Sequence, residues 1–177
     1  MSNSLPDSKE VLRSRARALA RTAERPQQAG TTLDLLEFRL AQERYAVENR
    51  WVQEVCPFKE LVPLPCTPPF VLGIVNVRGR IFPVFDLKKF FELPEKGLTD
   101  LHRIILVRGH GLEFGILADV IVGVQAVAVD SLQPSLATLT GIRDDYLMGV
   151  TSDHLVVLDL ARILTDPKII VHEEVDA

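Results

Sequence analysis

The chain has 177 residues, of which 47% are hydrophobic and 25% charged, which is typical of a soluble globular protein and excludes a disordered one. No apolar run approaches the roughly 18 residues that span a bilayer, and the N-terminus lacks the apolar segment of a signal peptide. Residues 1–30 carry six basic and three acidic side chains, a net charge of +3, so the remainder of this −4 chain carries −7. We therefore expect a cytoplasmic protein without direct membrane insertion and without a nucleic-acid partner.

The N-terminal segment, residues 1–32, predicts a basic amphipathic helix followed by a linker. An apolar stripe at helical spacing runs from Val11 to Ala23, and Pro26 ends the pattern. A different face carries an arginine every four residues, at Arg13, Arg17 and Arg21. Two interpretations stay open for this face: a solvated arm, or an auxiliary basic surface that contacts a partner.

From Leu35 onward the apolar period changes from 3.6 to 2, which predicts short strands. The first three are expected at Leu36–Leu40, around Tyr45 to Val47, and at Val52–Val55. In the third strand the simplest interpretation puts Val52 and Val55 in the core and turns Glu54 toward solvent or a partner. The segment Pro57–Pro69 holds five prolines, so it predicts a crossing loop, ending in one helical turn at Phe70–Leu72.

The most informative stretch is Gly73–Leu87, which predicts two apolar strands around a tight turn at Arg78-Gly79. Asp86 is expected to cap a short helix at Leu87–Phe91. The guanidinium of Arg78 would present five donors at the end of a rigid hairpin, a geometry that suits carboxylates or carbonyls of a partner. The alternative is a solvated turn residue, which is the interpretation we favour for Arg80.

The second half of the chain repeats the order of features in the first. Strands are predicted at His102–Val107 and Leu112–Leu117, and the match to the first half runs at an offset of 69 residues. Leu155–Leu160 matches Phe82–Leu87 at an offset of 73, with Asp159 as the second helix cap. Short strands in two similar halves predict two small β-barrels that share an apolar seam.

Catalytic and metal-binding motifs are missing from the sequence. It lacks the G-x-S-x-G, H-E-x-x-H and G-x-x-x-x-G-K patterns, and its two cysteines and four histidines are scattered. Helix capping accounts for Asp86 and Asp159. We expect no enzymatic activity, no metal and no cofactor. A ligand-binding or scaffold module built on small barrels stays open as an alternative.

Several blocks of the sequence resemble the CheW family, the coupling proteins of bacterial chemosensory arrays. The most specific block is Asn76-Val77-Arg78-Gly79 followed by Pro83-Val84-Phe85-Asp86-Leu87. The resemblance covers roughly residues 33–165 and also includes these shorter matches: Leu36-x-Phe38-x-Leu40, Tyr45-x-Val47, Val52-Gln53-Glu54-Val55, Pro69-x-x-x-Gly73, Phe114-Gly115-x-x-x-Asp119-x-Ile121 and Tyr146-Leu147-x-Gly149.

This resemblance implies an all-β fold of two five-stranded SH3-like barrels that share a core. We expect a CheW-like domain at residues 33–165, with barrels at roughly 33–92 and 101–165 that are allowed to intertwine, and a tail at 166–177. The family's role implies a non-enzymatic adaptor in arrays on the inner face of the membrane. Its expected partners are the cytoplasmic helical tip of a chemoreceptor, the regulatory domain of a CheA-type histidine kinase and other CheW-like domains.

The resemblance also implies roles for individual residues. Receptor contact is expected at Asn76, Val77, Arg78, Phe114 and Ile121, and kinase contact at Val52, Glu54 and Gly73. The second half has Thr151–His154 where the first half has its Arg-Gly turn. The cationic contact is therefore expected only at Arg78.

Overall fold

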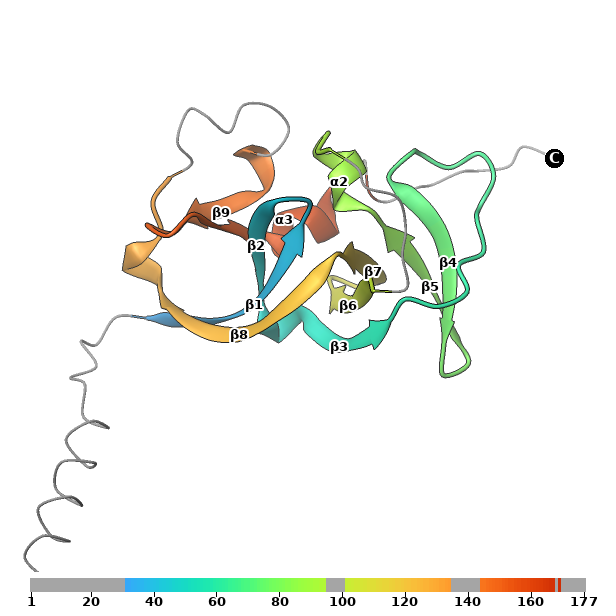
Figure 1. The fold of residues 1–177 in the computed structure, drawn as a ribbon, viewed down its shortest axis with the longest axis horizontal. Helices are drawn as coiled ribbons and strands as arrows, with labels where there is room; N and C mark the ends of the chain where they lie inside the picture. Colours follow the sequence, from blue (N-terminus) through green and yellow to red (C-terminus); the bar gives the residue numbers. More distant parts are fainter. Residues whose placement is uncertain (1–30, 95–100, 135–143, 168, 170–177) are drawn as a thin grey trace, which may run out of the picture. The chain divides into compact units, whose positions relative to one another are not determined.

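The computed structural model describes residues 31–94, 101–134, 144–167 and 169 (Figure 1). The expected basic face at Arg13, Arg17 and Arg21 lies outside these residues. The described part contains ten strands: β1 (Thr32–Leu40), β2 (Glu43–Glu48), β3 (Val52–Pro57), β4 (Val71–Val77), β5 (Arg80–Phe85), β6 (Arg103–Gly109), β7 (Leu112–Ala118), β8 (Val120–Ala128), β9 (Leu147–Val150) and β10 (Leu155–Leu158). The helices are α2 (Leu87–Phe90), α3 (Leu160–Thr165) and three 3₁₀ turns, η1 (Asn49–Trp51), η2 (Val129–Ser131) and η3 (Asp144–Tyr146).

The strands form two five-stranded sheets, which confirms the all-β expectation. One sheet, called barrel A, has the order β8-β1-β2-β10-β9, and the other, barrel B, has the order β3-β6-β7-β5-β4. Figure 1 shows the two sheets side by side. Neighbouring strands are antiparallel except in two pairs, β2 with β10 and β5 with β7.

Each barrel takes strands from both halves of the chain, so the barrels are intertwined. Barrel A combines β1 and β2 with the last three strands, and barrel B combines β6 and β7 with β3, β4 and β5. Residues at the sequence offsets of 69 and 73 form equivalent strand pairs. Val84 pairs with Gly115 in barrel B, and their counterparts Val157 and Ala46 pair in barrel A. The internal repeat predicted from the sequence is therefore also a repeat of strand pairing.

Both barrels are closed by the same local device. An isolated bridge joins Val62 to Ile74 in barrel B, and a second joins Gln133 to Val150 in barrel A. Each bridge runs beside a glycine on the end strand. A Cβ on Gly73 would lie 2.2 Å from the carbonyl oxygen of Val62, and one on Gly149 would lie 2.9 Å from that of Gln133. The lack of a side chain at these positions is what lets the two backbones approach.

A β-bulge at Gln53 gives the third strand its expected orientation, with Val52 and Val55 on one face and Glu54 on the other. The pairing with β6 shifts between Val52 and Glu54, and this extra residue reverses the alternation of side chains that follow it. Glu54 is consequently half-buried, whereas Val55 is 39% exposed. The prediction that Val55 belongs to the core is wrong. The equivalent bulge in β8 falls at Val122, again 69 residues later.

The core has three parts. One cluster fills barrel B around Phe82, Val84 and Leu106, and another fills barrel A around Leu35 and Val157. The largest cluster takes residues from both sheets and joins the barrels, which confirms the predicted apolar seam. It is built largely from aromatic and branched aliphatic side chains, including Phe38, Tyr45, Phe85, Ile105, Phe114 and Leu158.

Both predicted helix caps are confirmed. The Asp86 carboxylate accepts a hydrogen bond from the amide of Lys88 at 2.9 Å, and Asp159 accepts one from the amide of Arg162 at 3.1 Å. The helical turn expected at Phe70–Leu72 is wrong, because Val71 already begins β4. Among the described helices, none has the length and hydropathy needed to cross a membrane.

Candidate functional site

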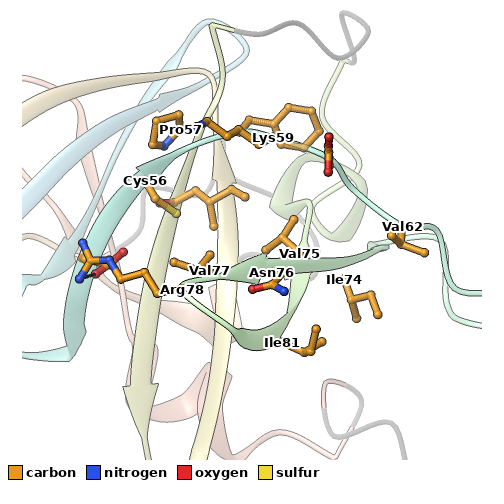
Figure 2. Close-up of a pocket in the computed structure, with 14 residues that line it drawn as sticks. Cys56, Pro57, Lys59, Val62, Ile74, Val75, Asn76, Val77, Arg78 and Ile81 are labelled. Carbon is orange, nitrogen blue, oxygen red and sulfur yellow. Dashed lines mark hydrogen bonds and ion pairs between the residues drawn. The ribbon is translucent and has the colours of Figure 1, made fainter.

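A groove of about 940 Å³ runs along barrel B where its two end strands, β3 and β4, face each other (Figure 2). One wall comes from Cys56, Pro57 and the start of the proline-rich loop, and the other comes from the segment Ile74–Arg78. The walls are mainly apolar, and two of their side chains, Val62 and Ile81, are about 60% exposed. Apolar side chains left this exposed at a concave surface suit the core of a protein interface.

The tip of the β4–β5 hairpin has the backbone of a type I′ turn. Arg78 and Gly79 have φ values of +53° and +82°, so a non-glycine residue occupies the left-handed region at Arg78. The side-chain oxygen of Asn76 accepts a hydrogen bond from the amide of Gly79 at 2.8 Å. Asn76 therefore stabilises the turn that carries Arg78. The sequence predicts only a receptor contact for Asn76, not this structural role.

Arg78 and Glu54 meet across the groove, although the sequence predicts different partners for them. Their closest atoms, Arg78 Nη1 and Glu54 Oε2, are 3.2 Å apart. In Figure 2 Arg78 lies at one end of the groove and Val62 at the other. The groove is thus bounded by an ion pair at one end and by the Val62–Ile74 bridge at the other. The Arg78 side chain is 82% exposed, so water screens the pair strongly.

We expect this ion pair to contribute little to folding. A double-mutant cycle with Glu54→Gln and Arg78→Ala should give a coupling free energy of about 0.2–1 kcal/mol, as for other exposed pairs. Urea unfolding of the four proteins measures it. Coupling well above 1 kcal/mol would mean that Arg78 is a structural residue and is not held available for a partner.

The other residues with predicted contact roles are scattered. Phe114 is 2% exposed and stacks on Phe85 with ring centroids 4.6 Å apart, so it packs in the shared core, and its receptor contact stays a prediction. Val52 and Ile121 are partly buried against the shared core. Gly73 is buried beside Val62, where it closes barrel B.

Sequence reasoning missed part of the groove, including Val62 and Ile81. These residues come from separate segments that only the pairing of β3 with β6 and of β4 with β5 brings together. One feature of the sequence that pointed to the groove was Cys56, on β3. Its Sγ donates a weak hydrogen bond to the carbonyl of Ile104 at 3.7 Å, and burial raises the pKa of this thiol. A thiol with a raised pKa is a poor nucleophile at neutral pH.

A second cluster of ionisable groups lies where the chain passes from β7 to β8. Asp119 Oδ1 is 2.6 Å from Nζ of Lys88 and 3.0 Å from Nε2 of His102, and Oδ2 accepts a hydrogen bond from the amide of Ala41 at 2.7 Å. Burial opposes ionisation of Asp119, but these bonds outweigh it and keep the pKa of Asp119 below its usual value. The cluster joins α2 and the residue before β6, both next to barrel B, to the β1–β2 turn of barrel A.

Comparison with known proteins gives the family. The family model for the CheW-like domain matches residues 34–168. The chain belongs to the CheW-like family. Among similar proteins, the chemotaxis protein CheW of Treponema pallidum is 30% identical over 142 residues, covering 76% of this chain and 84% of the relative. The protein FrzA of Myxococcus xanthus is 33% identical over 135 residues, covering 76% and 79%.

A solved CheW structure supports the fold of this CheW-like chain. The scaffolding protein TtCheW of Thermoanaerobacter tengcongensis aligns with a TM-score of 0.65 at 30% identity, over 72% of this chain and 89% of that one. The fold class expected from the resemblance, two SH3-like barrels with a shared core, is confirmed. In the described part of this CheW-like chain, no three His, Cys, Asp or Glu side chains gather as metal ligands would.

Proposed function

We propose that this CheW-like chain is a non-enzymatic adaptor that couples chemoreceptors to a CheA-type histidine kinase. Its place would be the cytoplasm, in chemosensory arrays on the inner face of the membrane, beside other CheW-like domains. The family supports this proposal, as do relatives named as chemotaxis protein CheW and a structural neighbour named as a scaffolding protein.

The groove of barrel B is the observation that carries the proposal. It combines exposed apolar side chains with a charged residue on a rigid hairpin, which is the composition of a protein-docking surface. Its chemistry does not favour catalysis, since its thiol has a raised pKa and a catalytic site needs a nucleophile, a base and an orienting group.

Within this proposal the two partners meet at the Arg78 end of the groove. Asn76, Val77 and Arg78, with Ile121, would face the receptor tip, and Val52, Glu54 and Gly73 would lie on the kinase side. Gly73 would act by keeping barrel B closed and not by direct contact, because its neighbourhood is filled by Val62 and Pro63. The ion pair between Arg78 and Glu54 would place residues of both contacts within 3.2 Å of each other.

The test is kinase activation in a reconstituted mixture of receptor tips, kinase and adaptor. Arg78→Ala should lower the affinity for the receptor tip by about tenfold or more, because a hydrogen bond to a charged group contributes about 1.5–3 kcal/mol. Circular dichroism should show an unchanged fold. Arg39→Ala, which removes an exposed arginine on β1 of barrel A, is the matched control and should leave affinity unchanged. If Arg78→Ala activates the kinase as the wild type does, the role assigned to Arg78 is wrong.

A further inference from the structure

Two arginines share one carboxylate at the end of barrel B. Arg80 begins β5, Arg108 lies near the end of β6, and both guanidinium groups donate to different oxygens of Glu113 on β7. Gln53 also reaches Glu113, with Nε2 3.4 Å from Oε1. The guanidinium of Arg80 lies over the ring of Phe82, 5.0 Å from its centroid, so the cluster covers the apolar interior of the barrel.

This cluster has a surplus of positive charge and of donors. It contains two cations and one anion, whereas residues 31–177 as a whole carry a net charge of −7. In the described part of the chain, Glu113 is the only carboxylate that forms an ion pair with either arginine. Both arginine side chains are more than half exposed. Because each guanidinium has five donors, a second carboxylate can be bound without displacing Glu113.

The internal repeat shows that an ion pair at this place in a barrel does not require a surplus of positive charge. Glu113 lies 69 residues after Arg44, and Asp153 lies 73 after Arg80, so these positions are equivalent in the two barrels. In barrel A the signs are reversed. There Arg44 binds two carboxylates, those of Glu37 at 2.7 Å and Asp153 at 2.9 Å. An ion pair recurs at this place, but only barrel B is left with a cationic surplus.

The cluster continues directly from the groove. Gln53 is the residue before Glu54, and Arg80 is paired with Val77 across the hairpin that carries Arg78. Ile81, a neighbour of Arg80 in sequence, lines the groove. A chain segment lying in the groove would therefore reach Arg80 and Arg108 after it passes Arg78.

We propose that Arg80 and Arg108 form a carboxylate-binding subsite that receives an acidic side chain of a protein segment docked in the groove. The docking of a protein in the groove rests on the proposed function. The subsite predicts the chemistry of the docked segment, which should have apolar residues followed by an acidic residue. Arginine forks match planar carboxylates, and a polar rim beside an apolar patch is the ordinary design of an interface. The acidic body makes nucleic acid and anionic membranes the poorer fits.

The first experiment needs no natural partner. The side-chain Nε–H signals of ¹⁵N-arginine-labelled protein are followed during titration with the peptide acetyl-Leu-Val-Glu-Asp-amide or its neutral analogue acetyl-Leu-Val-Gln-Asn-amide. The acidic peptide should move the signals of Arg80 and Arg108 and bind at least about fivefold more tightly than the neutral one. Equal binding of the two peptides, or stronger shifts with phosphatidylserine vesicles or an oligonucleotide, would overturn the proposal.

Two variants sharpen the result. Glu113→Gln removes the competing anion while keeping a hydrogen-bonding side chain, so binding of the acidic peptide should tighten by about threefold or more. Arg80→Glu with Arg108→Glu should abolish the preference for the acidic peptide, whereas Arg39→Glu should leave it unchanged. A Glu113→Gln protein that binds the acid more weakly would contradict the subsite.

The same variants separate this inference from the proposed function. With the kinase regulatory domain or the receptor tip, the double reversal should slow association by about tenfold at low salt, and the deficit should shrink at high salt. If the wild type binds a partner and the double reversal behaves like Arg39→Glu, the subsite is refuted and the adaptor role survives. If the wild type binds neither partner but keeps its peptide preference, the adaptor role fails and the subsite survives.

Discussion

Replacing Gly73 with alanine should destabilise the protein by about 3–5 kcal/mol. The new Cβ would lie 2.2 Å from the Val62 carbonyl oxygen and 2.9 Å from Cα of Pro63, and both neighbours are backbone atoms that cannot rotate away. The residue also has a φ of +145°, which an L side chain rarely adopts. Backbone strain and overpacking each cost about 1–3 kcal/mol. The free energy of unfolding in urea measures the sum.

Gly79→Ala is the matched control for this loss. Gly79 also has a positive φ, of +82°, but an added Cβ would meet nothing within 4 Å. It should therefore lose only the cost of the left-handed backbone, about 1–2 kcal/mol. If Gly73→Ala is no less stable than Gly79→Ala, closure of barrel B does not depend on the close approach at Val62.

Asp119→Ala should destabilise the protein by about 3 kcal/mol. The Lys88 side chain is only 3% exposed, and Asp119 is the carboxylate 2.6 Å from its ammonium group. Removing one partner of a buried ion pair leaves a charge that has lost its solvation, which typically costs about 3–5 kcal/mol, and partial exposure of Asp119 puts this site at the lower end. Asp153→Ala is the control: that carboxylate pairs with Arg44 but is mostly exposed, so the variant should lose less than about 1 kcal/mol.

The Asp119 cluster also sets a pH dependence. Its carboxyl group has a lower pKa in the folded protein than in the unfolded chain, so the unfolded state binds a proton first as the pH falls. The stabilisation is fully present above the unfolded pKa of about 3.9 and is lost as the pH drops through the folded pKa. In Asp119→Asn the contribution of residue 119 to the acid-induced loss of stability should be absent. An identical fall of stability below about pH 4 in both proteins would show that Asp119 does not contribute to it.

Much of the fold could be predicted because local chemistry repeats. The change of apolar period at Leu35 marks the first strand, and Asp86 and Asp159 end their strands as helix caps in both halves. Residues related by the offsets of 69 and 73 form equivalent strand pairs in the two barrels. The sequence left open whether the two halves exchange strands, because an apolar strand pattern does not indicate which sheet a strand joins.

The site was harder to predict because it depends on register. A bulge at Gln53 turns Glu54 toward the groove, as the spacing of Val52 and Val55 implied, but that spacing does not show that Val55 stays 39% exposed. The family resemblance identified Arg78 and Glu54 but not their contact. It also included Phe114, an aromatic residue that packing against Phe85 keeps in the core. The groove itself exists only after β3 and β4 are placed at the two ends of one sheet.

Docking of a signalling partner in the groove of barrel B can be tested by methyl NMR. Wild-type protein with labelled Ile and Val methyls is titrated with the regulatory domain of a CheA-type histidine kinase and with a chemoreceptor tip. The groove methyls of Val62, Ile74 and Ile81 should shift or broaden with at least one of the two partners. The exposed methyls of Val129, a residue outside the groove lining, serve as the reference and should not respond. Binding that perturbs other surfaces and leaves all three groove residues unchanged would contradict docking in the groove.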